Sequence, residues 1–413
     1  MMYFGWFSWI LYVIAFFVLF FLAKSAWMFW REEVYKSKLN WALLEIKVPR
    51  EVLKGPKAME QFFAALFGLK NEAESFKEAW WNGEITRYHS FEIVGMNNEA
   101  RFFIRTPKVL QKAVEGIFYA QYPEIEMVEV EDYWDKLPAS YQEAFQQGYE
   151  IFGAEAKMEQ SPAFPIKTYI QFEEETGDEK GRIVDPLAVL LEMIHNLKPE
   201  EMIFVQYIVQ PDAKQHWHHD AAHQMKVLQA TSRQSGVDDK GQPLVRFRFR
   251  TKDEEEAMEM IEGKMRRATF ETSVRYFHMA PQKIFNVNIG YRGLRSYFWQ
   301  FNNNRQQFDQ NAPIMSRTEW YFWPFIFHKV RGYYRRVKLY QETRERFLPE
   351  ETFAGKLYNS IIPWRFCFSH KMCILTSEEL ATLFHIPTNV VLTQSSMERI
   401  ESKRLSPPSQ LPS

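Results

Sequence analysis

The first 23 residues form an uninterrupted apolar run, MMYFGWFSWILYVIAFFVLFFLA, which contains no charged side chain. An α-helix needs about 20 apolar residues to cross the hydrocarbon core of a bilayer. A buried core helix would be polar on one face, and a cleavable signal peptide would have a basic start and a small-residue cleavage site. The run has none of these features. The run therefore predicts a transmembrane helix: residues 1–30 form a membrane anchor, and residues 7–30 contact the bilayer.

The flanks of this run predict how it sits in the membrane. Indole rings favour the headgroup zone, and the tryptophans toward the two ends of the run are the expected anchors: Trp6, Trp9, Trp27 and Trp30. No basic residue precedes the run, whereas several follow it: Lys24, Arg31, Lys36 and Lys38. By the positive-inside rule we expect a single-pass protein of the inner membrane, with its N-terminus outside and its main body in the cytoplasm.

The remainder of the chain has the composition of a folded protein with more than one domain. The whole chain of 413 residues exceeds one ordinary core, and 46% of its residues are hydrophobic, which excludes a disordered chain. A net charge of -1 argues against a globally basic nucleic-acid binder. Cys367 and Cys373 are too few for a disulfide framework and fit a reduced cytosolic setting.

Residues 41–132 predict the element order β-α-β-β-α-β. Strand-like segments alternate with two helical patterns, one of which opens at Pro56 and the other at Pro107, and a turn is expected at residues 95–98. This order is that of the split βαβ, or ferredoxin-like, arrangement. We therefore expect an α+β fold in which the anchor, followed by a juxtamembrane segment at 31–40, leads into a ferredoxin-like domain.

A second α+β unit with a similar order is expected at residues 164–301, after a polar connector at 133–163. Its first strand is predicted at 166–172, and further strands are predicted at 202–209 and 269–279. The two units then form tandem ferredoxin-like domains. The rest of the chain divides into an irregular basic and aromatic segment at 302–370, a short closing α/β element at 371–400 with a capping box at Thr376 and Glu379, and a proline-rich tail at 401–413.

The stretch HWHHDAAH, residues 216–223, differs from the zinc-protease motif HExxH by an aspartate in place of the glutamate. Two histidines four residues apart on a helix can bind zinc, and the candidate ligands are His216, His219 and His223. Asp220 is one methylene shorter than the usual base, and no third ligand follows at a known spacing. We favour a solvent-facing helix end with no bound metal and expect no cofactor, and zinc hydrolysis remains the alternative.

Nucleotide hydrolysis requires a phosphate-binding loop of the form G-x-x-x-x-G-K-[ST]. The two Gly-Lys pairs, at Gly263 and Gly355, are followed by Met265 and Leu357 where Ser or Thr is needed. No nucleophile elbow or dinucleotide fingerprint is present either. We therefore predict no catalytic residues and a protein that is not an enzyme.

A basic and aromatic tract spans residues 329–346. Its cations are candidates for contacts with phosphate in DNA or in anionic lipid: Lys329, Arg331, Arg335, Arg336, Lys338, Arg344 and Arg346. The competing interpretation is a helix whose basic stems cover apolar surface, with Glu342 and Glu345 as neighbours.

Several strings together resemble the N-terminal, membrane-anchored region of type IV secretion and conjugation-type ATPases, the TraG/TraD-like coupling proteins of the FtsK/HerA superfamily in candidate-phyla bacteria. They are LEIKVPRE, RFFIRTP, YPEIEMVEVEDY, FPIKTYIQFE, VDPLAVLLEMIHNLKPEE, LTSEELATLFHIP and RIESKRLSPPSQLP. In that family the proline-rich close leads into a P-loop motor, whereas this sequence ends at Ser413. The resemblance implies the anchoring and docking half of such a machine.

These observations lead to one main functional expectation and two alternatives. The main expectation is a non-catalytic, membrane-anchored docking component that acts with a separate P-loop ATPase and channel subunits, with a second copy of the chain as a further candidate partner. The alternatives are a zinc hydrolase using His219 and His223, and a DNA-binding accessory protein using the tract 329–346.

Overall fold

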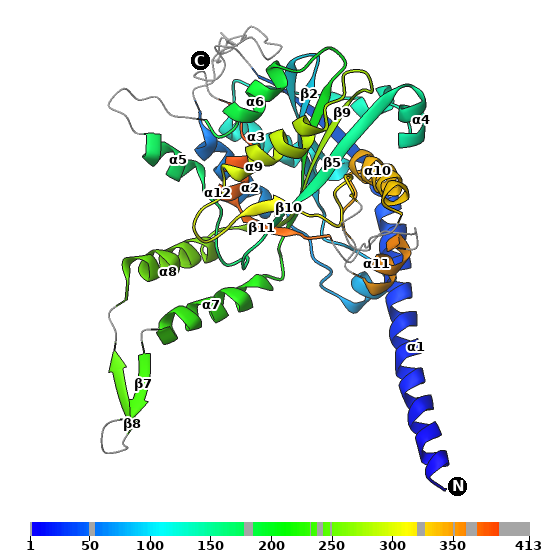
Figure 1. Cartoon of the computed structure of the whole chain (residues 1–413), viewed down its shortest axis with the longest axis vertical. Coiled ribbons are helices and arrows are strands. Elements are labelled where there is room, and N and C mark those ends of the chain that lie inside the picture. The colour runs from blue at the N-terminus through cyan, green and yellow to red at the C-terminus, as the bar shows by residue number, and fades with distance from the viewer. Residues whose placement is uncertain are drawn as a thin grey trace, which may run out of the picture.

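One antiparallel sheet of nine strands organises the computed structural model of the chain (Figure 1). The structure describes residues 2–48, 54–176, 185–231, 233–237, 243–247, 250–319, 327–349, 352–360 and 370–387. The predicted tail at 401–413, Cys367 and most of the C-terminal part of the predicted closing element lie outside these residues. Within them, the predicted combination of helices with an antiparallel sheet, the α+β class, is confirmed.

The first half of the sheet follows the predicted element order. Its members are β1 (Trp41–Lys47), α2 (Pro56–Phe67), β2 (His89–Met96), β3 (Glu99–Pro107), α3 (Gln111–Gln121) and β4 (Glu126–Val130). In space the strands run β2-β3-β1-β4. β2 and β3 are joined at Asn97 and Asn98, which both have positive φ, as a tight two-residue hairpin turn requires.

The second half has the corresponding elements. They are β5 (Tyr149–Met158), α5 (Tyr169–Thr176), α6 (Ala188–His195), β6 (Met202–Pro211), β9 (Thr269–Pro281), α9 (Arg295–Trp299) and β10 (Phe308–Gln310). In space the strands run β10-β5-β9-β6. β6 pairs with β2 from His89↔Val209 to Met96↔Met202, so the two halves share one continuous sheet.

Short helical segments connect these elements. They are η1 (Glu78–Asn82), η2 (Lys108–Leu110), η3 (Tyr133–Lys136), α4 (Tyr141–Gln146) and η4 (Ile289–Leu294). An insertion between β6 and β9 contains α7 (Trp217–Thr231), β7 (Arg233–Val237), β8 (Pro243–Phe247) and α8 (Lys252–Met265). We call this insertion the arm, because its two helices leave the body and carry the β7–β8 hairpin at their far end (Figure 1).

Three sequence predictions about the second half are wrong. The strand expected at 166–172 is absent, and α5 begins inside that range. The first strand is instead β5, which lies in the predicted connector at 133–163. The segment 302–370, predicted to be irregular, contains β10, the 18-residue helix α10 (His328–Glu345) and α11 (Phe353–Ser360).

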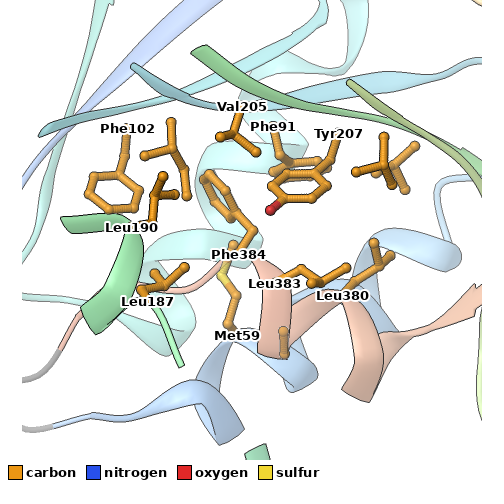
Figure 2. Packing of buried hydrophobic residues seen from close by; sticks show 14 of the residues in the cluster. Met59, Phe91, Phe102, Leu187, Leu190, Val205, Tyr207, Leu380, Leu383 and Phe384 are labelled. Carbon is orange, nitrogen blue, oxygen red and sulfur yellow. The ribbon is translucent and has the colours of Figure 1, made fainter. Parts of the chain in front are cut away.

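The main hydrophobic core lies on one face of the sheet, which α2, α3, α6, α9 and the C-terminal α12 (Ser377–Leu383) cover. Alternate residues of each strand point into it, such as Phe91 and Ile93 from β2, as the period of two requires. Figure 2 shows Met59 of α2 and Phe384 packed beneath the sheet residues Phe102 and Val205.

The opposite face carries a smaller core under η3, α4 and α10. It includes Val94, Phe204 and Phe277 from the strands, Trp134 from η3 and Leu339 from α10. Besides this core, the same face carries several buried charged side chains.

The closing element ties the C-terminal part of the chain into both halves. β11 (Cys373–Thr376) pairs with the first residues of β9, and α12 packs against α2. The predicted capping box at Thr376 and Glu379 is confirmed by hydrogen bonds in both directions. Phe384 lies 5.3 Å from Phe91, measured between ring centroids, so this element completes the main core.

Candidate functional site

The N-terminal helix α1 (Met2–Ser37) projects from the body with its N-terminal end far from the sheet (Figure 1). Apolar side chains from Trp9 to Leu22 are exposed all around it. Among the described residues it is the one helix long and apolar enough to span a membrane. Of the predicted anchors, Trp9 and Trp30 are exposed and Trp27 is half-buried, whereas the Trp6 side chain lies outside the described part of the structure.

One face of α1 is held by the loop that contains η1. The indole Nε1 of Trp27 donates a hydrogen bond to the carbonyl of Trp80 at 2.8 Å, and its ring lies 5.6 Å from that of Trp81. Gly83 ends this loop in the left-handed region, at φ +65°, where a Cβ would meet the backbone carbon of Arg31 at 2.3 Å. Only glycine permits so close an approach in this conformation.

Another face of α1 is held by α11. The ring of Phe353 lies 6.0 Å from that of Phe21, and the backbone N–H of Ala354 donates to Ser25 Oγ at 2.8 Å. One turn further on, the rings of Tyr358 and Phe29 are 5.5 Å apart. The base of α1 is therefore fixed to the body by two segments that are about 270 residues apart in the sequence, counting from Trp80 to Phe353.

A cavity of about 270 Å³ lies between the base of α1 and the body. Its lining carries charges of both signs, so it does not select either an anion or a cation on charge alone. The charged lining residues are Glu32, Lys36, Glu72, Glu84 and Lys214.

The basic tract lies on α10, and much of it faces the body. Arg331, Arg335, Lys338 and Arg346 are buried, Arg336 and Arg344 are half-buried, and Lys329 is exposed. Arg346 binds Glu92 through Nε at 2.9 Å and Nη2 at 3.1 Å, and it also pairs with Asp132. Arg335 donates to the carbonyls of Ala312 and Met315.

The burial of Arg331, Arg335, Lys338 and Arg346 argues against a phosphate-binding role for these four residues of the tract 329–346. A buried side chain that pairs within the body is not available to a nucleic acid or a lipid headgroup. The alternative interpretation, a helix whose basic side chains cover the body, describes α10 as observed.

A buried polar row crosses the sheet beneath α10. Glu92, Gln206, Arg275 and Glu155 are direct cross-strand neighbours on β2, β6, β9 and β5. Segments from elsewhere in the chain meet this row: Gln206 donates to the carbonyl of Thr343 at 3.0 Å, and His370 contacts Glu155 at 2.8 Å.

The charges of this row and of Glu342, which faces it from α10, are balanced inside the protein. Burial alone would raise the pKa of Glu92, but the charge and hydrogen bonds of Arg346 outweigh burial and lower it. For Glu342, burial is likewise outweighed by His370 and Lys338, so its pKa is also lowered. Both carboxylates are held ionised, and the row fastens α10 to the sheet.

The histidines of the HWHHDAAH stretch lie on the arm. His219 and His223 are exposed one turn apart on α7, and His216 is exposed just before the helix begins. Among the described residues no group of three or more His, Cys, Asp or Glu side chains could hold a metal ion. The zinc-hydrolase alternative therefore has a pair of exposed histidines but no closed ligand set in the described part of the chain.

The root of the arm is attached to the body by a small apolar cluster and a buried lysine. Trp217 and Ala221 of α7 pack on Ala257 and Ile261 of α8. The buried Lys264 donates to the carbonyl of Ile374 at 2.8 Å and pairs with Glu379 of α12. Burial lowers the pKa of this ammonium, and the charge of Glu379 partly opposes that effect.

Local sequence patterns missed two features of the site. The segments that hold α1 could have been suspected from the aromatic pair Trp80 and Trp81 in an otherwise polar loop. The buried polar row could have been suspected from Glu92 and Arg275, single charges inside strand-like runs. The partner of Trp80 lies 53 residues away and that of Glu92 lies 254 residues away, so no local pattern identifies them.

Comparison with known proteins adds one assignment. No curated protein matches the sequence. One family model, described as a domain of unknown function (DUF8128), matches residues 30–399. The match begins after the apolar run and spans both halves of the sheet, the arm and the closing element. The chain therefore belongs to the DUF8128 family.

Proposed function

We propose that the protein is a single-pass, membrane-anchored docking component. The observation that carries this proposal is α1: its apolar side chains are exposed from Trp9 to Leu22, and its base is fixed to the body on two faces. Exposing so long an apolar surface to water would be costly, whereas a bilayer would bury it. Under the positive-inside rule, the body lies on the cytoplasmic side of the inner membrane.

We infer further that the two halves of the body are tandem ferredoxin-like units. Each has two crossover helices, and the spatial order of its strands, numbered within the unit, is 4-1-3-2. That is the order of the split βαβ arrangement. The second strand of each unit meets that of the other at the β2–β6 pair, and the arm occupies the connection between the second and third strands of the second unit.

The arm is the element that we assign to partner binding. Its helices leave the body on the side away from α1, and the β7–β8 hairpin at their far end lies toward the same end of the molecule as the free end of α1 (Figure 1). Its root is fixed through Lys264 to α12. A protein anchored through α1 would therefore hold the arm beside the anchor and close to the membrane, where a neighbouring membrane complex can reach it.

The class of partner follows from the sequence resemblance. That resemblance favours a P-loop ATPase and channel subunits of a type IV secretion or DNA-transfer machine, with this chain in a non-catalytic role. The support is the similarity of the quoted strings together with an anchored body that carries a projecting arm.

The test is affinity purification of the tagged full-length protein from native membranes, followed by mass spectrometry. A matched variant replaces residues 226–255 by a short Gly-Ser linker and keeps the root residues Trp217, Ala221, Ala257 and Ile261. We expect a P-loop ATPase or channel subunits to co-purify with the full-length protein and to be lost with the variant. Recovery of neither class, or equal recovery with both proteins, would refute the docking role of the arm.

A further inference from the structure

We propose that two segments of the body, residues 74–83 and Phe353–Ser360, enter the headgroup region of the same membrane that α1 spans. We call these two segments the collar. The inference rests on the proposed membrane anchoring and extends it, because it assigns a lipid-binding surface to the body as well as to the helix.

Contacts along α1 place the collar at the depth of the headgroups. The apolar run ends at Ala23, and Lys24 is the first charge. Phe353 contacts Phe21, and Lys24 Nζ lies 5.2 Å from the ring centroid of Trp80.

The dimensions of helix and bilayer agree with that placement. With a rise of about 1.5 Å per residue, Phe21 and Trp27 are separated by about 9 Å along the helix. The headgroup layer of each leaflet is about 5 to 8 Å thick. The collar contacts therefore cover the end of the hydrocarbon core and the headgroup layer.

The collar exposes large apolar side chains at this depth. The exposed fractions are 73% for Phe76, 62% for Trp81, 48% for Leu357 and 64% for Tyr358. Tryptophan and tyrosine rings favour the membrane–water interface, where an apolar ring and a polar group can both be satisfied. Water would leave these surfaces unburied, but a headgroup layer around α1 would bury them.

The charges of the collar itself cancel, because Glu74 and Glu78 accompany Lys77 and Lys356, and Lys24 of α1 adds one positive charge beside it. Lys24 and Lys77 are exposed beside the aromatic rings, and ammonium groups at this depth are attracted to anionic headgroups. Exposed aromatic rings next to lysines, continuous with a lipid-facing helix, are the combination that a bilayer interface binds. We therefore assign the collar to lipid and not to a protein partner.

The collar has a mechanical consequence for the anchored protein. A single membrane-spanning helix can tilt and rotate in the bilayer, and the body attached to it moves with it. Residues 74–83 contact the face of α1 that bears Lys24 and Trp27, whereas α11 contacts the face that bears Phe21 and Ser25. Seating both segments in the headgroups fixes the orientation of the body, and with it the direction of the arm.

The test is site-directed spin labelling of the full-length protein in nanodiscs of phosphatidylcholine and phosphatidylglycerol. Single cysteines carry the label at Phe76 or Leu357, in a Cys367→Ser background that retains the buried Cys373. Val13, near the middle of the apolar run of α1, serves as the lipid reference. Val189, which is exposed to a similar extent as Leu357, is the aqueous control. It belongs to α6, which lies at the end of the body far from the free end of α1 (Figure 1).

The measured quantity is the ratio of collisions with oxygen, which partitions into lipid, to collisions with a water-soluble nickel chelate. We expect the ratio at Phe76 and Leu357 to lie several-fold above that at Val189 and below that at Val13. A lipid-like ratio at Val13 with both collar ratios equal to that of Val189 would overturn the collar, and leave its apolar surface to a protein partner. An aqueous ratio at Val13 would overturn the anchoring itself.

Discussion

At the scale of single residues, the clearest feature is that charge is buried in matched pairs. Arg346 illustrates this: it lies at the end of a basic tract that resembles a phosphate-binding strip, yet its guanidinium is enclosed by Glu92 and Asp132. The spacing of Arg331, Arg335, Lys338, Glu342 and Arg346 places them on one helix face. The sequence shows this charged face, but the acidic partners that make it an inner face lie up to 254 residues away.

Replacing Arg346 tests whether this buried pairing stabilises the fold. Arg346→Met leaves Glu92 buried without its partner, and we expect the free energy of unfolding to fall by about 3 to 5 kcal/mol. The double variant Glu92→Gln/Arg346→Met should lose less than the single variant, because no charge remains unpaired. Arg266→Met, which removes an exposed i,i+4 pair with Glu262, is the control and should change stability by about 0.5 kcal/mol or less. Denaturant unfolding measures all three, and equal losses for Arg346→Met and Arg266→Met would contradict the pairing.

Buried histidines predict an acid-sensitive stability. His278 is fully buried against Phe285, and burial lowers its pKa from 6.5 to about 4. Between these values the unfolded chain binds a proton that the folded chain does not, so stability falls as the pH falls from about 6.5 toward 4. In His278→Phe the fall should be shallower by about 1.4 kcal/mol per pH unit. Denaturant titrations at several pH values in this window measure the slope, and an unchanged slope would show that His278 does not contribute.

At the scale of elements, the sequence predicts helices with strong end signals and misses strands whose side chains are small. The proline at the start of α2 and the capping box of α12 locate those helices correctly. β5 was missed because its central residues, Gly153 and Ala154, have low strand propensity. The structure explains why glycine occupies position 153. A Cβ there would lie 2.4 Å from Leu339 Cδ2, so the packing of α10 on β5 requires a residue without a side chain.

The loop at 74–83 provides a test of how an element is docked on α1. Gly83→Ala adds a Cβ at positive φ against the backbone of Arg31, so we expect the loop to separate from α1 and trypsin to cleave faster after the exposed Lys77. Gly116→Ala is the matched control: it lies within α3 with no heavy atom within 4 Å of the added Cβ, and alanine favours a helix by about 1 kcal/mol. Limited proteolysis with mass spectrometry compares the two. Unchanged cleavage after Lys77 in Gly83→Ala would argue against tight docking of the loop.

At the scale of the whole molecule, the sequence predicts the element order of the first half, but it predicts neither the first and last strands of the second half nor the assembly of the two halves. Periodicity indicates that a segment is a strand, yet it does not identify the strand edge that it joins. The pairing of β2 with β6, which joins the two halves, and the pairing of β11 with β9 could therefore not be predicted from periodicity. The family match over residues 30–399 is consistent with this assembly, because it treats both halves and the closing element as one stretch.

The assembled molecule predicts that the arm can be shortened without loss of the fold. The variant that replaces residues 226–255 by a linker keeps the Trp217 cluster and the Lys264–Glu379 pair. We expect its thermal unfolding midpoint in detergent to lie within a few degrees of that of the full-length protein. A collapse of the midpoint would mean that the arm is part of the folding unit, and would invalidate the variant as a docking control.

The most direct test of the account is the position of the protein relative to its native membrane. Membranes are washed with alkaline carbonate, and protease is applied separately to intact protoplasts and to inverted vesicles. We predict that the protein stays in the membrane pellet, and that the body is cleaved in inverted vesicles but protected in protoplasts. Release by carbonate, or cleavage of the body in intact protoplasts, would contradict a single-pass anchor with a cytoplasmic body.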